Sequence, residues 1–156
     1  MLHLSDQISI LPAPPAQSDQ PPRCELRIDG RATGLCLSGV VLEAALRCDA
    51  GWLLFLTDDV PFEDMLSIHL LNPAGTLRLD SARIGSAYAT GNFRALQIQP
   101  PDTLAFHFMG GTPWSVQLLA VPAWRLPFVG EPAGVHRPFG FLRRFVVRGA
   151  PRPAPR

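Results

Sequence analysis

The chain has 156 residues, of which 47% are apolar and 17% are charged, and its formal net charge at pH 7 is +1. This composition excludes an intrinsically disordered chain, and the length predicts one domain with a substantial hydrophobic core. Residues 1–10 carry no arginine or lysine, and no apolar run is long enough to cross a membrane. We therefore expect a cytoplasmic protein.

All fourteen basic residues are arginine, which is typical of a GC-rich, bacterial gene. They are unevenly placed, because residues 123–156 hold seven arginines against a single glutamate, whereas residues 1–122 are net acidic. The three cysteines, Cys24, Cys36 and Cys48, lack zinc spacing and are too few for a closed disulfide framework. They predict reduced thiols that pack as small apolar residues.

The chain begins with a proline-rich segment, and we expect residues 1–22 to form a flexible arm. Beyond it, short apolar segments alternate with turn residues at the spacing of an all-β protein. The segment 52–57 is apolar on both faces, which predicts a central strand. The predicted strands cover residues 24–28, 40–48, 52–57, 65–71, 76–84, 93–99, 103–109 and 114–121.

Two-residue alternation assigns the faces of these strands. In 40–48 it places Leu42, Ala44 and Leu46 on one face, and the short links between strands favour antiparallel pairing. We predict an all-β fold, an antiparallel sandwich or small barrel of about eight or nine strands with flexible proline-rich termini. Its parts are the arm 1–22, a single β domain 23–149 and a disordered tail 150–156.

The sequence contains no nucleophile elbow and no phosphate-binding loop. We therefore assign no catalytic residue, no metal and no cofactor. The densest group of carboxylates is Asp58, Asp59, Glu63 and Asp64. Four carboxylates on one loop suit a hard cation, but their spacing departs from that of a calcium loop, which favours a solvated hairpin loop.

Two histidines are the candidates for a site. His69 and His107 both fall on the more polar faces of their predicted strands. If those strands are neighbours in one sheet, the imidazoles converge with Asp80 or Arg78 in a metal or general-base site. The alternative is that both histidines are surface residues without a function.

The carboxyl-terminal segment 139–148 is the candidate contact for a partner. It carries Arg143, Arg144, Phe145 and Arg148, and such a basic, aromatic segment suits an acidic protein or another anionic partner. The alternative is a final strand or short helix that packs its apolar side on the domain and leaves the arginines in water. The acidic middle of the chain argues against nucleic acid.

These observations lead to two main hypotheses. The first is a non-enzymatic binding or interaction module that uses the arginine and aromatic carboxyl-terminal segment. The second is a small metal-dependent or ligand-binding β-barrel enzyme that uses His69 and His107. A third hypothesis is self-assembly through an exposed edge strand. The three tryptophans, Trp52, Trp114 and Trp124, are expected in the core.

Overall fold

The computed structural model describes residues 2–14, 17–60, 63–86, 91–127 and 129–149. These residues form three antiparallel sheets and contain no helix, so none of their segments is a helix that could span a membrane. The predicted all-β sandwich is confirmed. The described residues form thirteen strands, more than the eight or nine predicted. The strands that were not predicted include the two-residue strands β1 and β12, strand β2 in the proline-rich segment, and β4 after the turn at residues 29–30.

The strands divide among a six-stranded, a four-stranded and a three-stranded sheet. The six-stranded sheet has the order β1-β5-β6-β7-β8-β12, with bounds His3–Leu4, Val41–Cys48, Gly51–Thr57, Leu66–Leu71, Arg78–Ile84 and Val135–His136. The four-stranded sheet has the order β13-β11-β10-β9, with bounds Leu142–Arg148, Trp114–Trp124, Thr103–His107 and Arg94–Gln99. The three-stranded sheet has the order β2-β3-β4, with bounds Ile8–Ala13, Arg23–Ile28 and Arg31–Ser38.

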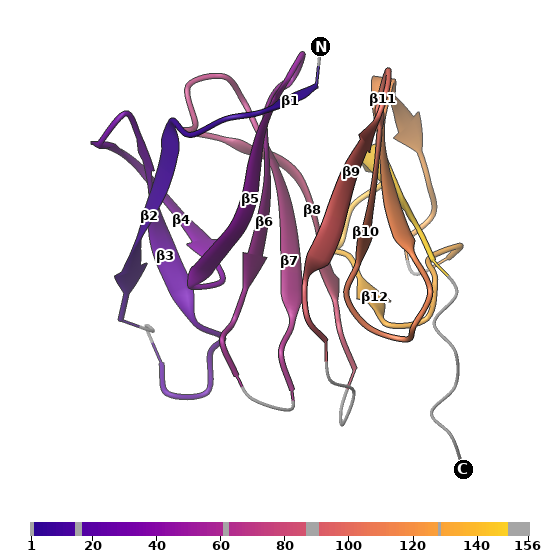
Figure 1. Ribbon diagram of the computed structural model, residues 1–156, viewed down its shortest axis with the longest axis horizontal. Coiled ribbons are helices and arrows are strands. Elements are labelled where there is room, and N and C mark those ends of the chain that lie inside the picture. Colours follow the sequence, from indigo (N-terminus) through magenta and orange to yellow (C-terminus); the bar gives the residue numbers. More distant parts are fainter. Residues whose placement is uncertain (1, 15–16, 61–62, 87–90, 128, 150–156) are drawn as a thin grey trace.

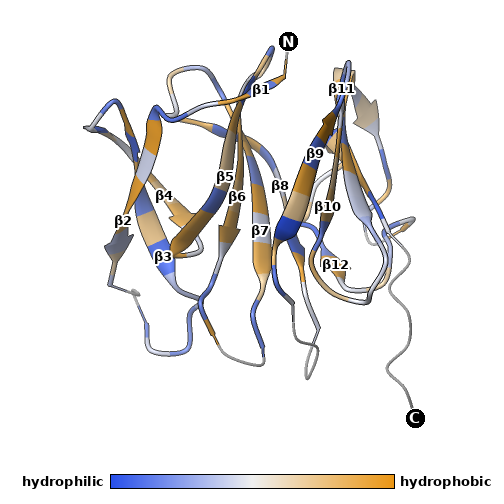
Figure 2. Cartoon of the chain, viewed as in Figure 1, coloured by the Kyte–Doolittle hydropathy of each residue, from blue (hydrophilic) through white to orange (hydrophobic). Residues whose placement is uncertain are grey.

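The six-stranded sheet lies between the other two, as Figure 1 shows. Each of its faces therefore has a core of its own. Strand β6 shows this most clearly, because all seven of its residues are buried. Leu53 and Phe55 pack toward the four-stranded sheet, whereas Leu54 and Leu56 pack toward the three-stranded sheet. Figure 2 shows the resulting hydrophobic residues along β6 and β7. The prediction of a central strand is confirmed.

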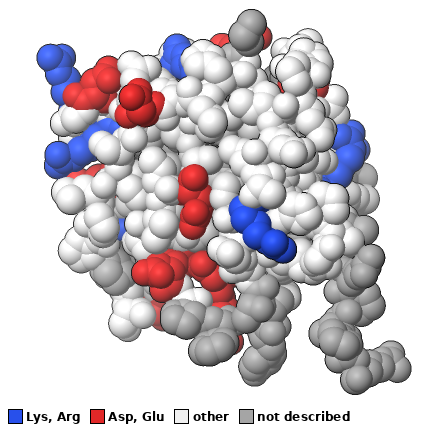
Figure 3. All heavy atoms as spheres, viewed as in Figure 1, with Lys and Arg blue, Asp and Glu red and all other residues white. Residues whose placement is uncertain are grey.

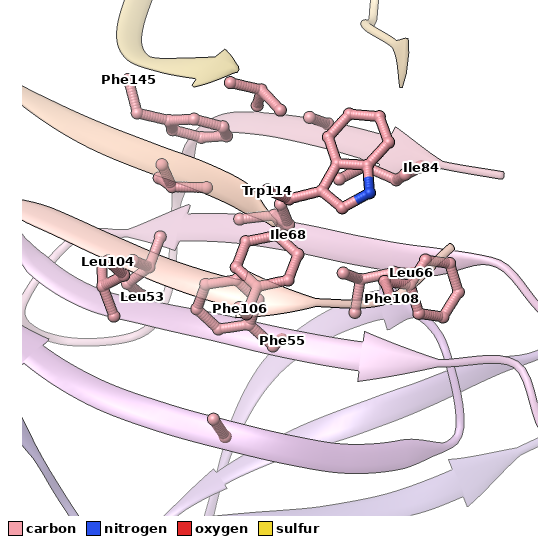
Figure 4. Packing of buried hydrophobic residues seen from close by; sticks show 14 of the residues in the cluster. Leu53, Phe55, Leu66, Ile68, Ile84, Leu104, Phe106, Phe108, Trp114 and Phe145 are labelled. Atoms are coloured by element: carbon pink, nitrogen blue, oxygen red, sulfur yellow. The ribbon is translucent and has the colours of Figure 1, made fainter. Parts of the chain in front are cut away.

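The larger core is built around aromatic rings. The centroids of Phe55, Phe93 and Phe106 lie 5.3 to 5.4 Å apart, within the range in which ring pairs attract one another. Figure 4 shows the rings of Phe55 and Phe106 side by side, with Trp114 close to them. The indole N–H of Trp114 donates to the carbonyl of Met109 at 3.0 Å, so this buried polar group is satisfied.

The amino-terminal segment is more ordered than its prolines suggest. Strand β1 pairs with β5, and β2 pairs with β3 along its whole length. Ile8 is only 6% exposed in the smaller core, which stabilises this pairing. Pro12 is tolerated because β2 is an edge strand. Residues 1–22, which were expected to form a flexible arm, thus contain two strands that pair with the sheets. The expected tail 150–156 lies outside the described residues.

A bulge changes the face of one predicted core residue. The register of β5 against β6 shifts between Leu42 and Ala44. Leu42 therefore packs on the side of the three-stranded sheet, whereas Ala44 and Leu46 face the four-stranded sheet. Strict alternation had placed all three on one face, and the extra residue of a bulge is what breaks that alternation.

Candidate functional site

His69 is a buried residue of β7. Its side chain faces the three-stranded sheet and is 1% exposed. The Nε2–H donates to the carbonyl oxygen of Ser38 at 3.1 Å, and Ser38 Oγ donates to Ser67 Oγ at 3.1 Å. Burial lowers the pKa of His69 to about 4, so the imidazole is neutral at pH 7. This contact joins β7 to the end of β4.

His107 lies far from this contact in the fold. It ends β10 in the four-stranded sheet, opposite Arg94, and its side chain is half-buried. Because β7 and β10 belong to different sheets, the strands of His69 and His107 are not neighbours. The expected convergence of the two imidazoles is therefore not found. Within the described part of the chain, no group of three histidine, cysteine, aspartate or glutamate side chains is placed to hold a metal ion.

Asp80, the third residue of that hypothesis, has a different role. Its carboxylate accepts from Arg137 Nη2 at 2.7 Å and from the backbone N–H groups of Ser81 and Arg144 at 2.8 and 2.7 Å. The Arg137 guanidinium also lies 4.4 Å from the centroid of the Phe145 ring. Through the contacts of Asp80 with Arg144 and of Arg137 with Phe145, this buried charge pair links β8 to β13. Asp80 also lines a surface groove, where its carboxylate is already held by these three donors.

The acidic loop is also partly structural. Asp58 is 6% exposed and its Oδ2 lies 2.7 Å from Arg83 Nη2, while its backbone N–H donates to Asp64. Burial raises the pKa of Asp58 despite the arginine. Asp59 and Glu63 are exposed. Figure 3 shows a group of acidic side chains at the lower end of the molecule, the end at which the β6–β7 loop lies in Figure 1.

The four predicted contact residues all fall in β13, and two of them face inward. Arg143 is 6% exposed and Phe145 is fully buried in the larger core, since the two-residue period of the strand puts both on its inner side. Arg143 donates to the carbonyl oxygens of Pro138 and Leu142. Arg148 is exposed and Arg144 is half-buried. Phe145 is thus out of reach of a partner, which corrects the prediction for that residue. Arg143 lines a surface groove, but its guanidinium is already bound to these two carbonyl groups.

An exposed aromatic cluster lies beside these residues. Trp124, Phe139 and Phe141, which we call the aromatic patch, are 76%, 72% and 41% exposed. The ring centroids of Trp124 and Phe141 are 5.6 Å apart, and so are those of Phe139 and Phe141. The three rings thus pack on one another while a large part of their surface faces solvent. Soluble proteins rarely leave contiguous apolar surface open unless it binds something.

Strand pairing holds the patch in place. Trp124 lies opposite Leu142 in the β11–β13 ladder, and the N–H of Arg125 donates to the carbonyl oxygen of Phe141 at 2.8 Å. A groove of about 450 Å³ adjoins the rings, and its lining also includes Arg78, Asp80 and Arg143. Arg78 and Arg125 are exposed, and neither is in an ion pair with another described residue. The patch therefore combines apolar rings with unpaired positive charge.

The sequence contains a signal for the exposure of Trp124, although this residue was expected in the core. Trp124 was expected in the core with Trp52 and Trp114, which are indeed 3% and 0% exposed. Pro122 and Pro127 flank Trp124, however, and proline marks the edge or end of a sheet because it donates no ladder hydrogen bond. Comparison of the chain with family models, curated proteins and solved structures found no match.

Proposed function

We propose that the protein is a non-enzymatic binding module and that its contact surface is the aromatic patch together with Arg78 and Arg125. Its partner is an acidic protein segment that also carries apolar side chains. The observation that carries the proposal is the exposure of three aromatic rings, of which Trp124 and Phe139 both pack on Phe141. The unpaired Arg78 lines the adjoining groove, and the unpaired Arg125 follows Trp124 in the chain.

The rings supply most of the binding energy in this proposal. Covering an exposed aromatic side chain contributes about 2 kcal/mol. Trp124 and Phe139 are the two most exposed members of the patch, so they are the expected anchors. Their contact with Phe141 restricts the rings before binding, which reduces the entropy lost when the partner docks.

The arginines supply the preference for an acidic partner. Arg78 and Arg125 are solvent-exposed, so they attract a negative segment over a range set by the salt concentration. A guanidinium also presents a planar fork that matches a carboxylate. We therefore expect the association rate to fall as salt is raised, whereas the contribution of the rings persists.

The test is selection of binding peptides from a random library displayed on phage, with the full chain as bait. We expect the enriched peptides to combine aspartate or glutamate with aliphatic or aromatic residues. Trp124→Ala and Phe139→Ala are expected to weaken their binding at least tenfold. The control is Leu4→Ala, because Leu4 is 62% exposed on β1 and is not part of the patch.

Point substitutions suit this test better than truncation. Phe145 and Val147 of β13 belong to the larger core, so removal of the carboxyl-terminal segment would unfold the domain. Enriched peptides that bind Trp124→Ala as well as the parent chain would overturn the proposed surface. Binding to phosphatidylserine vesicles or to oligothymidylate, without enrichment of acidic peptides, would overturn the proposed partner.

A further inference from the structure

A second cavity is lined by strands of both the six-stranded and the four-stranded sheet. It measures about 570 Å³ and is bordered by the β5–β6 turn and the β9–β10 turn, which both lie at the upper end of the molecule in Figure 1. Residues of four strands, β5, β7, β11 and β13, line it together with the two turns and with Leu2, which precedes β1.

The wall of the cavity is mostly aliphatic. Leu2, Leu70 and Leu118 line it, and Leu2 and Leu70 also belong to the larger core. Cavities of this size and lining are typical of sites for small ligands. Since one water-sized group occupies about 30 Å³, the cavity has room for about nineteen such groups, which is more than a ten-carbon chain with a polar head group needs.

The charged groups of the cavity differ in whether they already have partners. Asp102 accepts from Thr103 Oγ1 at 2.9 Å and from Gln117 Nε2 at 3.3 Å. Asp49, in the β5–β6 turn, also lines the cavity and is engaged in an interaction of its own. The side chain of Arg144, by contrast, makes no hydrogen bond or ion pair with the residues that the structure describes.

The other two arginines of β13 differ from Arg144, because their side chains do have hydrogen-bond partners. Arg143 donates to backbone carbonyl groups, and Arg148 donates to Gln117 Oε1 at 2.8 Å. Only the backbone N–H of Arg144 is engaged, by Asp80. A half-buried guanidinium at an aliphatic cavity is suited to a carboxylate, which accepts two parallel hydrogen bonds from it.

We propose that this cavity binds a single-chain amphipathic carboxylate, with its carboxylate on Arg144 and its aliphatic chain against Leu2, Leu70 and Leu118. The site is separate from the aromatic patch, so either proposal stands without the other. The cavity combines an aliphatic wall with one arginine, Arg144, whose side chain has no described partner. This combination indicates the ligand class.

Isothermal titration calorimetry with three ligands of equal chain length tests the head group. We expect decanoate to bind more tightly than decanol or decylamine. Arg144→Gln is expected to weaken decanoate about tenfold or more and to leave decanol unchanged, because it removes a charge-assisted contact. The matched control is Arg148→Gln, which removes an arginine of the same strand that does not line the cavity.

A thiol measurement locates the ligand in the parent chain without any substitution. Cys48 lines the cavity and burial raises its pKa, whereas Cys36 is exposed on β4. We expect decanoate to slow the modification of Cys48 by a thiol reagent, measured by peptide mass spectrometry, and to leave Cys36 unaffected. Decanoate binding no tighter than decanol, an unchanged affinity in Arg144→Gln, or an unprotected Cys48 would each overturn the proposal.

Discussion

The buried imidazole of His69 makes the stability of the domain sensitive to acid. In the folded chain its pKa is about 4, against 6.5 for an unperturbed histidine, because the side chain lies between two sheets and near Arg78 and Arg83. Below pH 6.5 the unfolded chain takes up a proton that the folded chain does not. The free energy of unfolding therefore falls as the pH drops from 6.5 to about 4, and this loss ends below that value.

The size of the effect follows from the two pKa values. The difference between 6.5 and about 4 corresponds to about 3 kcal/mol of stability lost across this window. That is a large part of the stability of a typical domain. Protonation would also add a charge beside Ser38 and Ser67, which lie where β4 meets the six-stranded sheet.

Urea unfolding between pH 7.5 and pH 4, followed by tryptophan fluorescence, measures this loss. We expect His69→Gln to be less stable at pH 7.5 by about 1 kcal/mol, because it loses the hydrogen bond to Ser38. Between pH 6.5 and pH 4, the free energy of unfolding of His69→Gln should therefore fall by about 3 kcal/mol less than that of the parent chain. His107→Gln is the control, since His107 lies half-buried in another sheet. Parallel pH profiles for the parent chain and His69→Gln would refute the reasoning.

Three further substitutions test the packing. Asp80→Ala should cost about 3–5 kcal/mol in urea unfolding, because it leaves Arg137 buried without its partner; a cost below 1 kcal/mol would contradict the pair's role. Gly51→Ala should lower the melting temperature, because Gly51 has a φ of 143° and an added Cβ would meet the carbonyl oxygen of Leu71. Phe106→Ala should cost about 3–5 kcal/mol, and an unchanged denaturation midpoint would contradict its place in the aromatic core.

The period of the sequence was enough to find eight of the thirteen described strands, β3 and β5 to β11, and most of their faces. The segment of β6 is predicted as central because both of its faces are apolar from Trp52 to Leu56. The face of His69 was also predicted correctly, on the side of β7 away from Ile68. Its environment was not predicted, because alternation shows which residues share a face and says nothing of what covers that face.

The parts that could not be predicted depend on contacts between distant segments. Whether β7 and β10 are neighbours is set by the pairing of whole sheets, so the separation of His69 from His107 has no local signal. Which residues of β13 face inward likewise depends on how this strand packs on the larger core, in which Phe145 is buried. Trp124 is different, because the prolines around it indicated the end of a sheet, and that signal favoured exposure over burial.

The three indole N–H groups offer the most direct test of the proposed contact surface. Those of Trp52 and Trp114 donate to the backbone carbonyls of Pro73 and Met109, whereas Trp124 is 76% exposed in the patch. In nitrogen-15 NMR spectra recorded during titration with an enriched acidic peptide, we expect the Trp124 indole signal to shift while the other two stay in place. Saturation of binding with the Trp124 signal unmoved would contradict the account.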